Sequence, residues 1–345
     1  MNVTRVLKQN QGSILISDPH MIQYLIGSYF DVGERFLGLL LQDQHATLFL
    51  NQLFPYINSA LSLVRYNDDD DPISLVAQHI QSKVVSVDHA LPSGFLLRLM
   101  NMKPTCTYQL DSTLDQFRSI KSEEEIQWMR EASRLNDEVM AKVPTFLHIG
   151  VSESDIAAKI IALFNDLSEG CSFEPIVAFG DHAADPHAKA EDRTLKVGEP
   201  IVIDMGCKIH GYCSDMTRTF FVGVNSMEKV YATVLQANCA AIAHVKPGVL
   251  LSDVDAAARS VIADARYGPY FIHRTGHGIG TSVHEPYSVS SESTVLCQAG
   301  MIFSIEPGIY LPGIGGVRIE DLVLVTNDGV EVLNHYPKQA EIIMP

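Results

Sequence analysis

The chain has 345 residues, of which 46% are hydrophobic and 19% charged, and its formal net charge is −16. The length predicts about two domains, and the composition is typical of a soluble globular enzyme. An acidic chain lacks the basic surface that phosphate backbones need, and this one has no run of about 18 apolar residues, so neither nucleic acid nor a membrane is an expected partner.

Residues 1–118 predict a separate, smaller α/β domain. Short apolar segments predict three strands and the end of a helix: Ser13–Ser17, Ala46–Leu50 and Lys83–Val87 for the strands, and Leu96–Asn101 for the helix. The segment Met1–Asp18 lacks a hydrophobic signal core with a small-residue cleavage site, so we expect a cytoplasmic protein. No cluster of catalytic residue types occurs in this half of the sequence, and a domain boundary is predicted near Arg118.

The second predicted domain, residues 119–345, contains an internal repeat. Ser122 and Glu125 have the spacing of a capping box, which predicts the start of the first helix of this domain. Further on, the segment Gly150–Ile156 matches Gly248–Val254, and each copy is a loop that leads into a helix. Each copy also follows a long helical stretch and precedes a candidate hairpin. We therefore expect an α/β (α+β) domain of two helix–helix–hairpin units, with the hairpins meeting across a pseudo-two-fold axis.

The first candidate hairpin covers Ile201–Gly223, with its turn in Lys208–Gly211. If the turn is centred between Ile209 and His210, Asp204 faces Asp215 directly across the ladder. Cβ atoms in such a pair are roughly 4.5–5.5 Å apart, and two like charges there need a proton or a cation between them. In the alternative interpretation the register differs and both acids are solvated.

The second candidate hairpin covers Ser304–Thr326 and repeats the same arrangement of acids. Glu306 and Glu320 are equidistant from Gly313 in the glycine-rich turn, so they too are expected to face each other. Four carboxylates on rigid strands suit one or two divalent cations. The two hairpins together therefore predict a metal site at the centre of the second domain.

Histidines gather close to the second hairpin in the sequence. His273, His277 and His284 lie within twelve positions, next to glycines that allow close backbone approach. His277 and His284 need not bind one ion together, so one can be a ligand while the other faces a substrate. His187, taken alone, is more typical of a loop histidine.

The region Lys121–Thr326 resembles the metallopeptidases of the pita-bread fold, the group of methionine aminopeptidase, aminopeptidase P and prolidase. The resemblance rests on the motifs IDMG, GYCSDMTRTF, TGHGIG, SIEPG and VRIED, and it implies five metal ligands: Asp204, Asp215, His277, Glu306 and Glu320. Residues 1–118 resemble the smaller N-terminal domain of aminopeptidase P, prolidase and creatinase. The family implies two divalent ions, most often Mn²⁺, with Co²⁺ or Zn²⁺ as alternatives, and the similarity to prolidases implies a homodimer.

The resemblance also implies roles for the other polar residues. His187 and His284 are expected to bind the substrate and take part in catalysis, while His273 and Arg318 are expected to bind the substrate. A departure from the family pattern is Phe179, where relatives usually carry Ser, which would alter the pocket wall. A second is the absence of any Arg between Arg274 and Arg318, which puts a strict dipeptide preference in doubt.

The predicted chemistry is hydrolysis of the Xaa-Pro bond in dipeptides or short proline-containing peptides. Two ions would activate a shared water, and Glu306 would carry its proton to the leaving proline nitrogen. We expect an Xaa-Pro dipeptidase, with an Xaa-Pro aminopeptidase that acts on longer peptides as the first alternative. A metal-free creatinase-like hydrolase and an inactive scaffold on the same fold are further alternatives, and both are disfavoured because all five ligand types are present.

Overall fold

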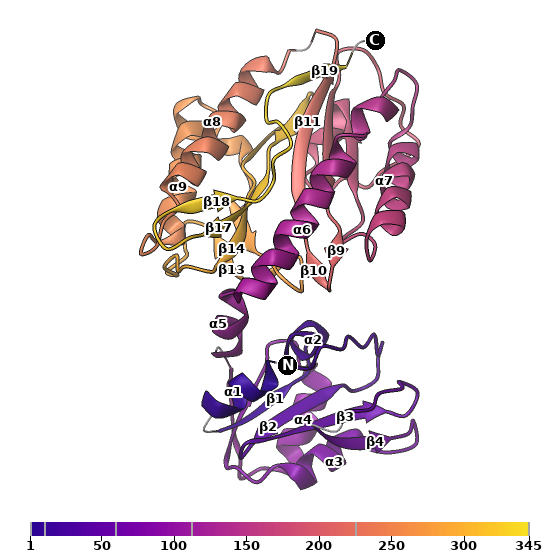
Figure 1. The fold of residues 1–345 in the computed structure, drawn as a ribbon, viewed down its shortest axis with the longest axis vertical. Helices are drawn as coiled ribbons and strands as arrows, with labels where there is room; N and C mark the ends of the chain where they lie inside the picture. Colours follow the sequence, from indigo (N-terminus) through magenta and orange to yellow (C-terminus); the bar gives the residue numbers. More distant parts are fainter. Residues whose placement is uncertain (1, 10–11, 59–60, 112, 225, 344–345) are drawn as a thin grey trace. The chain divides into compact units, whose positions relative to one another are not determined.

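The computed structural model describes residues 2–9, 12–58, 61–111, 113–224 and 226–343. It divides into two compact units, residues 1–118 and 119–345 (Figure 1). Each unit has hydrophobic clusters of its own, and every residue of such a cluster belongs to that one unit. Among the described residues no helix is both long and apolar enough to cross a membrane.

The N-terminal unit is built on a mixed six-stranded sheet with the strand order β4-β3-β2-β1-β5-β6. The strands are β1 (Ser13–Ile16), β2 (Gly38–Gln42), β3 (His45–Asn51), β4 (Ser62–Tyr66), β5 (Val84–Val87) and β6 (Thr107–Leu110). The helices are α1 (Val3–Gln9), α2 (Pro19–Ile26), α3 (Pro72–His79), α4 (Ser93–Met102) and α5 (Thr113–Ser119). The predicted strands correspond to β1, β3 and β5, and the predicted helix end lies in α4.

Two helices of this unit begin at the same local signal, an Asp followed by Pro. Asp18 accepts the His20 N–H ahead of α2, and Asp71 accepts the Ile73 and Ser74 N–H groups ahead of α3. The proline at the first helical position has no N–H to satisfy and is already in helical φ. Helix α2 ends at Gly27, whose φ of 75° is accessible at low cost only to glycine.

The C-terminal unit contains a four-stranded sheet, a five-stranded sheet and two short ribbons. The first sheet has the order β19-β11-β8-β7, with β7 (Ile176–Phe179), β8 (Pro200–Met205), β11 (Met216–Val222) and β19 (Glu341–Ile343). The second has the order β13-β12-β14-β17-β18, with β12 (Gly276–Gly278), β13 (Glu285–Val289), β14 (Ile302–Ile305), β17 (Asp321–Val325) and β18 (Val330–Val332). The ribbons are β9 (Lys208–Ile209) with β10 (Tyr212–Cys213), and β15 (Gly308–Leu311) with β16 (Gly315–Arg318).

Each of the two sheets has its own pair of long helices. Helices α6 (Glu123–Met140) and α7 (Glu153–Leu167) share a hydrophobic cluster with β7, β8 and β11. Helices α8 (Glu228–His244) and α9 (Leu251–Asp264) share another with β14 and β17, and Figure 1 shows them beside the five-stranded sheet. Helix α6 starts at the predicted capping box, in which both reciprocal hydrogen bonds are present.

The internal repeat predicted from the sequence recurs in the backbone. Gly150 and Gly248 both have φ of 85°. Their N–H groups donate to equivalent carbonyls, Gly150 to Leu195 O at 3.0 Å and Gly248 to Cys297 O at 2.9 Å. The copies differ at the helix start, because Ser152 caps α7 with its side chain whereas α9 has no side-chain cap. The unit is thus the duplicated helix–helix–hairpin arrangement that was expected.

The register predicted for the first hairpin is wrong by two residues. Asp204 pairs with Thr217, and β9 pairs with β10 through Ile209 and Tyr212. The turn therefore consists of His210 and Gly211, both with positive φ. Because side chains alternate with a period of two, a shift of two residues leaves Asp215 on the same face as Asp204, but diagonal to it rather than directly opposite.

The register predicted for the second hairpin is confirmed on both sides of the acids. Gly308 pairs with Arg318 on the turn side, and Ile305 pairs with Asp321 on the other. At Glu306 and Glu320 the ladder is interrupted, because their N–H groups turn to other strands. Glu306 N–H donates to Thr275 O at 2.7 Å and Glu320 N–H donates to Thr217 O at 3.1 Å. The interruption ties this hairpin to both sheets.

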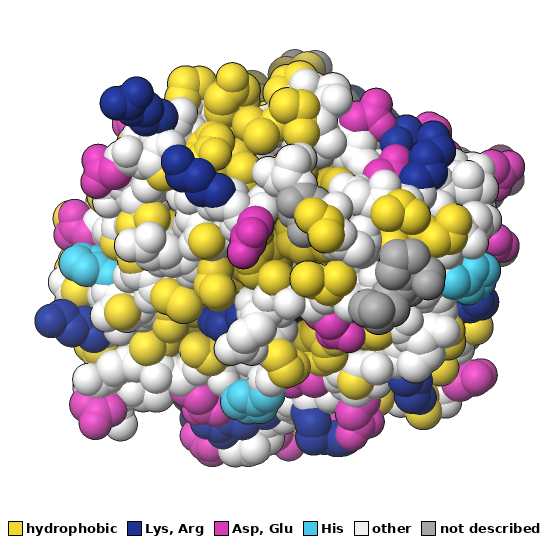
Figure 2. Space-filling view, turned by 90° about the horizontal axis from the view of Figure 1, so that it is seen from above, with side chains coloured by type: hydrophobic (Ala, Val, Ile, Leu, Met, Phe, Trp, Pro, Cys, Tyr) yellow, Lys and Arg dark blue, Asp and Glu magenta, His cyan; other side chains and the backbone are white. Residues whose placement is uncertain are grey.

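The face of the molecule shown in Figure 2 has charges of both signs. Acidic and basic side chains are interspersed around its rim, and apolar and uncharged groups fill much of its middle. The described residues on this face form no continuous basic area of the kind that phosphate backbones bind.

Candidate metal centre and its cavity

One cavity of about 670 Å³ in the C-terminal unit brings together every site residue predicted from the sequence. Its polar wall consists of acids, histidines and arginines: Asp204, Asp215, Glu306, Glu320, His187, His273, His277, His284, Arg274 and Arg318. Its apolar wall consists of Phe173, Ile176, Pro186 and Val283. Phe179 does not line it and is instead fully buried in the core with α7, so the expected change in the pocket wall is not seen.

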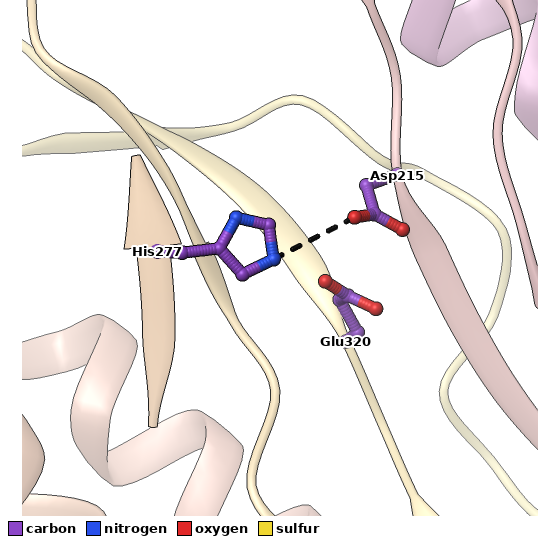
Figure 3. A group of neighbouring side chains, drawn as sticks. All are labelled: Asp215, His277 and Glu320. Carbon is purple, nitrogen blue, oxygen red and sulfur yellow. Dashed lines mark ion pairs between the residues drawn. The ribbon is translucent and has the colours of Figure 1, made fainter. Parts of the chain in front are cut away.

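Three buried side chains form a compact group with the donor atoms of a metal site. His277 lies on β12, Asp215 immediately before β11 and Glu320 immediately before β17 (Figure 3). One potential ligand atom from each lies within 4.8 Å of the others, and the His277 Nε2 atom is 3.7 Å from Asp215 Oδ2. The three side chains thus converge on one point from both sheets.

The two other acids flank this group. Asp204, on β8, accepts a hydrogen bond from Arg318 Nη2 at 2.7 Å. Glu306, directly after β14, places Oε1 at 3.3 Å from His277 Nε2 and accepts from Ser304 Oγ at 3.2 Å. Asp204 and Asp215 therefore come from the four-stranded sheet, and the remaining three candidates come from the five-stranded sheet.

The carboxylate oxygens of this site test whether the residues fit a metal. Asp204 Oδ1, Asp215 Oδ1 and Glu320 Oε1 are buried, and none has a hydrogen-bond partner among the described residues. An unpaired buried carboxylate oxygen is costly unless a proton or a cation is bound to it. Three such atoms belong to residues that line one cavity together with the His277 imidazole, and this set of donors is one that hard or borderline divalent ions prefer. The residues present therefore fit a divalent metal.

The electrostatics of the site favour the same interpretation. Burial raises the pKa of Asp215 and of Glu320 well above the ordinary value, and the neighbouring carboxylates raise both further. Burial also raises the pKa of Glu306 to about 7. The pKa of His277 falls to about 3, first because of burial and then because of the nearby His284. A neutral imidazole keeps the lone pair that a metal needs, whereas the crowded acids need a cation.

Arg318 connects the acids to a network of hydrogen bonds that the sequence did not reveal. Its Nη1 donates to Tyr310 OH at 2.9 Å and its Nε donates to Thr217 Oγ1 at 3.1 Å. Thr217 Oγ1 in turn donates to Glu320 Oε2 at 2.8 Å. Thr217 is two residues from Asp215 and so points to the same face of β11, which is the one sequence signal that could have identified it.

The remaining histidines lie around the metal candidates, outside the compact group. The ring of His284 contacts that of His277 edge-on at 4.3 Å between centroids, and His284 is exposed to the cavity. His187 is exposed in the segment between β7 and β8. His273 Nε2 accepts from Tyr310 OH at 2.9 Å, and burial lowers the His273 pKa to about 4. His187 and His284 are thus open to a substrate, whereas His273 supports the Arg318 network.

Replacing Glu306 with Gln is expected to change the pH dependence of stability in the metal-free protein. Because the folded-state pKa of about 7 exceeds the ordinary 4.5, the protonated Glu306 stabilises the fold at low pH and this contribution is lost as the pH rises through 7. The Gln side chain does not ionise, so the variant does not lose stability in this way. The free energy of unfolding of Glu306→Gln minus that of wild type should therefore rise by about 3 kcal/mol between pH 4.5 and 8. Thermal unfolding with a chelator at several pH values measures this difference, and a constant difference would contradict it.

Comparison with known proteins decides the family. Residues 127–327 match the model of metallopeptidase family M24. The chain belongs to this family. An uncharacterized peptidase of Staphylococcus aureus (strain USA300) is 38% identical to this M24 peptidase over 341 residues, which cover 96% of each chain.

Solved structures agree with the family assignment. A dipeptidase from Pyrococcus horikoshii OT3 matches with a TM-score of 0.90 and 34% identity, over 99% of this chain and 100% of that one. A prolidase from Thermococcus sibiricus matches with a TM-score of 0.91 and 31% identity, over 99% of both chains. The pita-bread fold expected from the sequence is therefore confirmed, and the chain is a metallopeptidase of a family that uses divalent metals.

Proposed function

We propose that this M24 peptidase is an Xaa-Pro dipeptidase that hydrolyses the bond before proline with the help of two divalent ions. The observation that carries the proposal is the convergence of five ligand candidates in one cavity, with three of their buried carboxylate oxygens unpaired. The apolar wall of that cavity suits a proline ring. The similarity to a dipeptidase and to a prolidase over nearly the whole chain supports this substrate class.

The ions would be held by the five acids and imidazole described above. Asp215, His277 and Glu320 form the compact group, and Asp204 and Glu306 complete the set beside it. One imidazole among carboxylate oxygens favours Mn²⁺, with Co²⁺ or Zn²⁺ as alternatives. Bound ions would polarise the scissile carbonyl and lower the pKa of the attacking water.

The protein side chains then have distinct roles in the proposed reaction. Glu306, whose Oε1 lies 3.3 Å from His277 Nε2 at the metal candidates, would take a proton from the attacking water and give it to the proline nitrogen as the bond breaks. His284 and His187, which are open to the cavity, orient the peptide and stabilise the developing oxyanion. Arg318 touches no substrate in this scheme, and it keeps Asp204 oriented through the 2.7 Å hydrogen bond.

The length preference is tested by a direct comparison of two substrates. With added Mn²⁺, we expect Ala-Pro to be hydrolysed with a kcat/KM at least about tenfold above that of Ala-Pro-Ala, a difference of about 1.4 kcal/mol. Release of free alanine from each peptide is the measurement. Faster cleavage of the tripeptide would instead identify an Xaa-Pro aminopeptidase. Cleavage of neither with the metal bound would reject these Xaa-Pro peptides as substrates, and a protein that binds no divalent ion would support an inactive scaffold. The homodimer and the cytoplasmic location stay predictions.

A further inference from the structure

Arg274 is a second arginine on the cavity wall, and among the described residues its guanidinium has no hydrogen bond to the network around Arg318. It lies two residues before β12 and is partly exposed. Its Nη1 donates to Ser288 Oγ on β13 at 2.9 Å. Since β13 pairs with β12, this bond holds the guanidinium against the strand pair that carries His277.

The charge of Arg274 is available for a ligand. Among the ion pairs between described residues, Arg318 is matched with Asp204, whereas none includes Arg274. Arg318 is also 2% exposed and its donors are taken by Asp204, Tyr310 and Thr217. Of the two arginines that line the cavity, Arg274 is therefore the one that can donate hydrogen bonds to a bound molecule.

Arg274 is also within electrostatic reach of the groups that would surround the scissile bond. After burial, its positive charge is the largest contribution to the lowered pKa of His284, and it also contributes to the lowered pKa of His277. It opposes the effect of burial on the pKa of Glu306. Arg274 and these three side chains line the same cavity, so a peptide bound there is within reach of the guanidinium.

We infer that Arg274 binds the free C-terminal carboxylate of the substrate and so selects dipeptides over longer peptides, an inference that rests on the proposed peptidase function. In a dipeptide the carboxylate follows the scissile bond by one residue, about 4 Å along the chain. The planar guanidinium matches a carboxylate with two parallel hydrogen bonds. A longer peptide has a neutral amide at that point, so the same cation selects against it.

The test compares an acid with its amide in the metal-loaded enzyme. Ala-Pro and Ala-Pro-NH2 are assayed with wild type, Arg274→Met and Arg274→Lys. The control is Arg134→Met, which changes an exposed arginine of α6. Arg274→Met should raise KM for Ala-Pro about 10- to 100-fold with little change in kcat, the range expected for a lost hydrogen-bonded charge pair. In Arg274→Met, the KM for Ala-Pro-NH2 should change less than about threefold. The KM of Arg274→Lys for Ala-Pro should lie between those of wild type and Arg274→Met, and the KM values of the control Arg134→Met should match those of wild type.

A binding measurement separates this inference from the proposed function. Calorimetry with non-hydrolysable Ala-Pro and Ala-Pro-NH2 analogues, in which a methylene replaces the scissile carbonyl, needs no turnover. Suppose that wild type has no dipeptidase activity but still binds the acid more tightly than the amide, and that this preference is lost in Arg274→Met and reduced in Arg274→Lys. That result would reject the proposed activity and keep the role of Arg274. Equal binding of acid and amide by wild type, or equal weakening of both in the variants, would overturn that role. If Arg274→Met does not fold, Arg274→Lys decides alone.

Discussion

Asp215→Asn and Glu320→Gln are each expected to lose divalent-metal binding and to lower peptidase activity by at least about 10³-fold. Each substitution preserves size and polarity but removes a negative charge from a buried group of acids. In the metal-free state these carboxylates repel one another, so the metal-free variants should be no less stable than metal-free wild type. The metal-loaded wild type should gain about 2.7 kcal/mol at a metal concentration 100 times Kd.

Metal analysis and thermal unfolding with Mn²⁺ or a chelator measure these effects. Glu292→Gln, at an exposed acid outside the cavity, is the matched control and should keep both the metal response and the activity. If Mn²⁺ left the melting temperature of every variant and of wild type unchanged, the acids would not form a metal site. Activity that survives exhaustive chelation would point instead to a metal-free hydrolase.

Gly276→Ala is expected to destabilise the C-terminal unit by about 3 kcal/mol or more, although it adds a single methyl group. A Cβ on Gly276 would lie 1.8 Å from the backbone carbonyl oxygen of Ser304 in β14. A backbone atom of a core strand cannot move aside as a flexible side chain can, so β12 and β14 must separate. The separation displaces His277 and Glu306, which flank this contact.

Chemical denaturation and metal titration together measure the Gly276→Ala effect. Gly329→Ala is the control, because its added Cβ would meet only Thr326 Oγ1, at 4.0 Å, an ordinary contact distance. The control should unfold within about 0.5 kcal/mol of wild type. Stability and metal affinity of Gly276→Ala equal to those of the control would contradict the close contact between β12 and β14 at Gly276.

The two hairpins show what the sequence could and could not predict. The second could be aligned because glycines mark its turn, and Gly313 has the positive φ that such a turn needs. In the first, the first positive-φ position of the turn is occupied by His210 and not by a glycine, so the turn could be located but not centred. The error of two residues did not change the face on which the acids lie, and for that reason the site was still found.

The residues that sequence reasoning missed share a physical cause. Thr217, Tyr310 and Arg274 have ordinary side chains in ordinary sequence surroundings, and they gain importance only through neighbours from other strands. Strand periodicity fixes the face on which a side chain lies, whereas hydrogen bonds depend on how two sheets pack. The N-terminal unit shows the same limit, because β2, β4 and β6 were not predicted although their partners were.

The division of the ligand candidates between two sheets has a consequence for how the protein is made. Asp204 and Asp215 belong to the first sheet, and Glu320, the last candidate in chain order, lies just before β17 of the second. During synthesis the set stays incomplete until Glu320 has been translated and β17 has paired with β14. Complete coordination by the proposed ligands would therefore follow synthesis of nearly the whole chain, and a chain truncated before Glu320 would lack one of them.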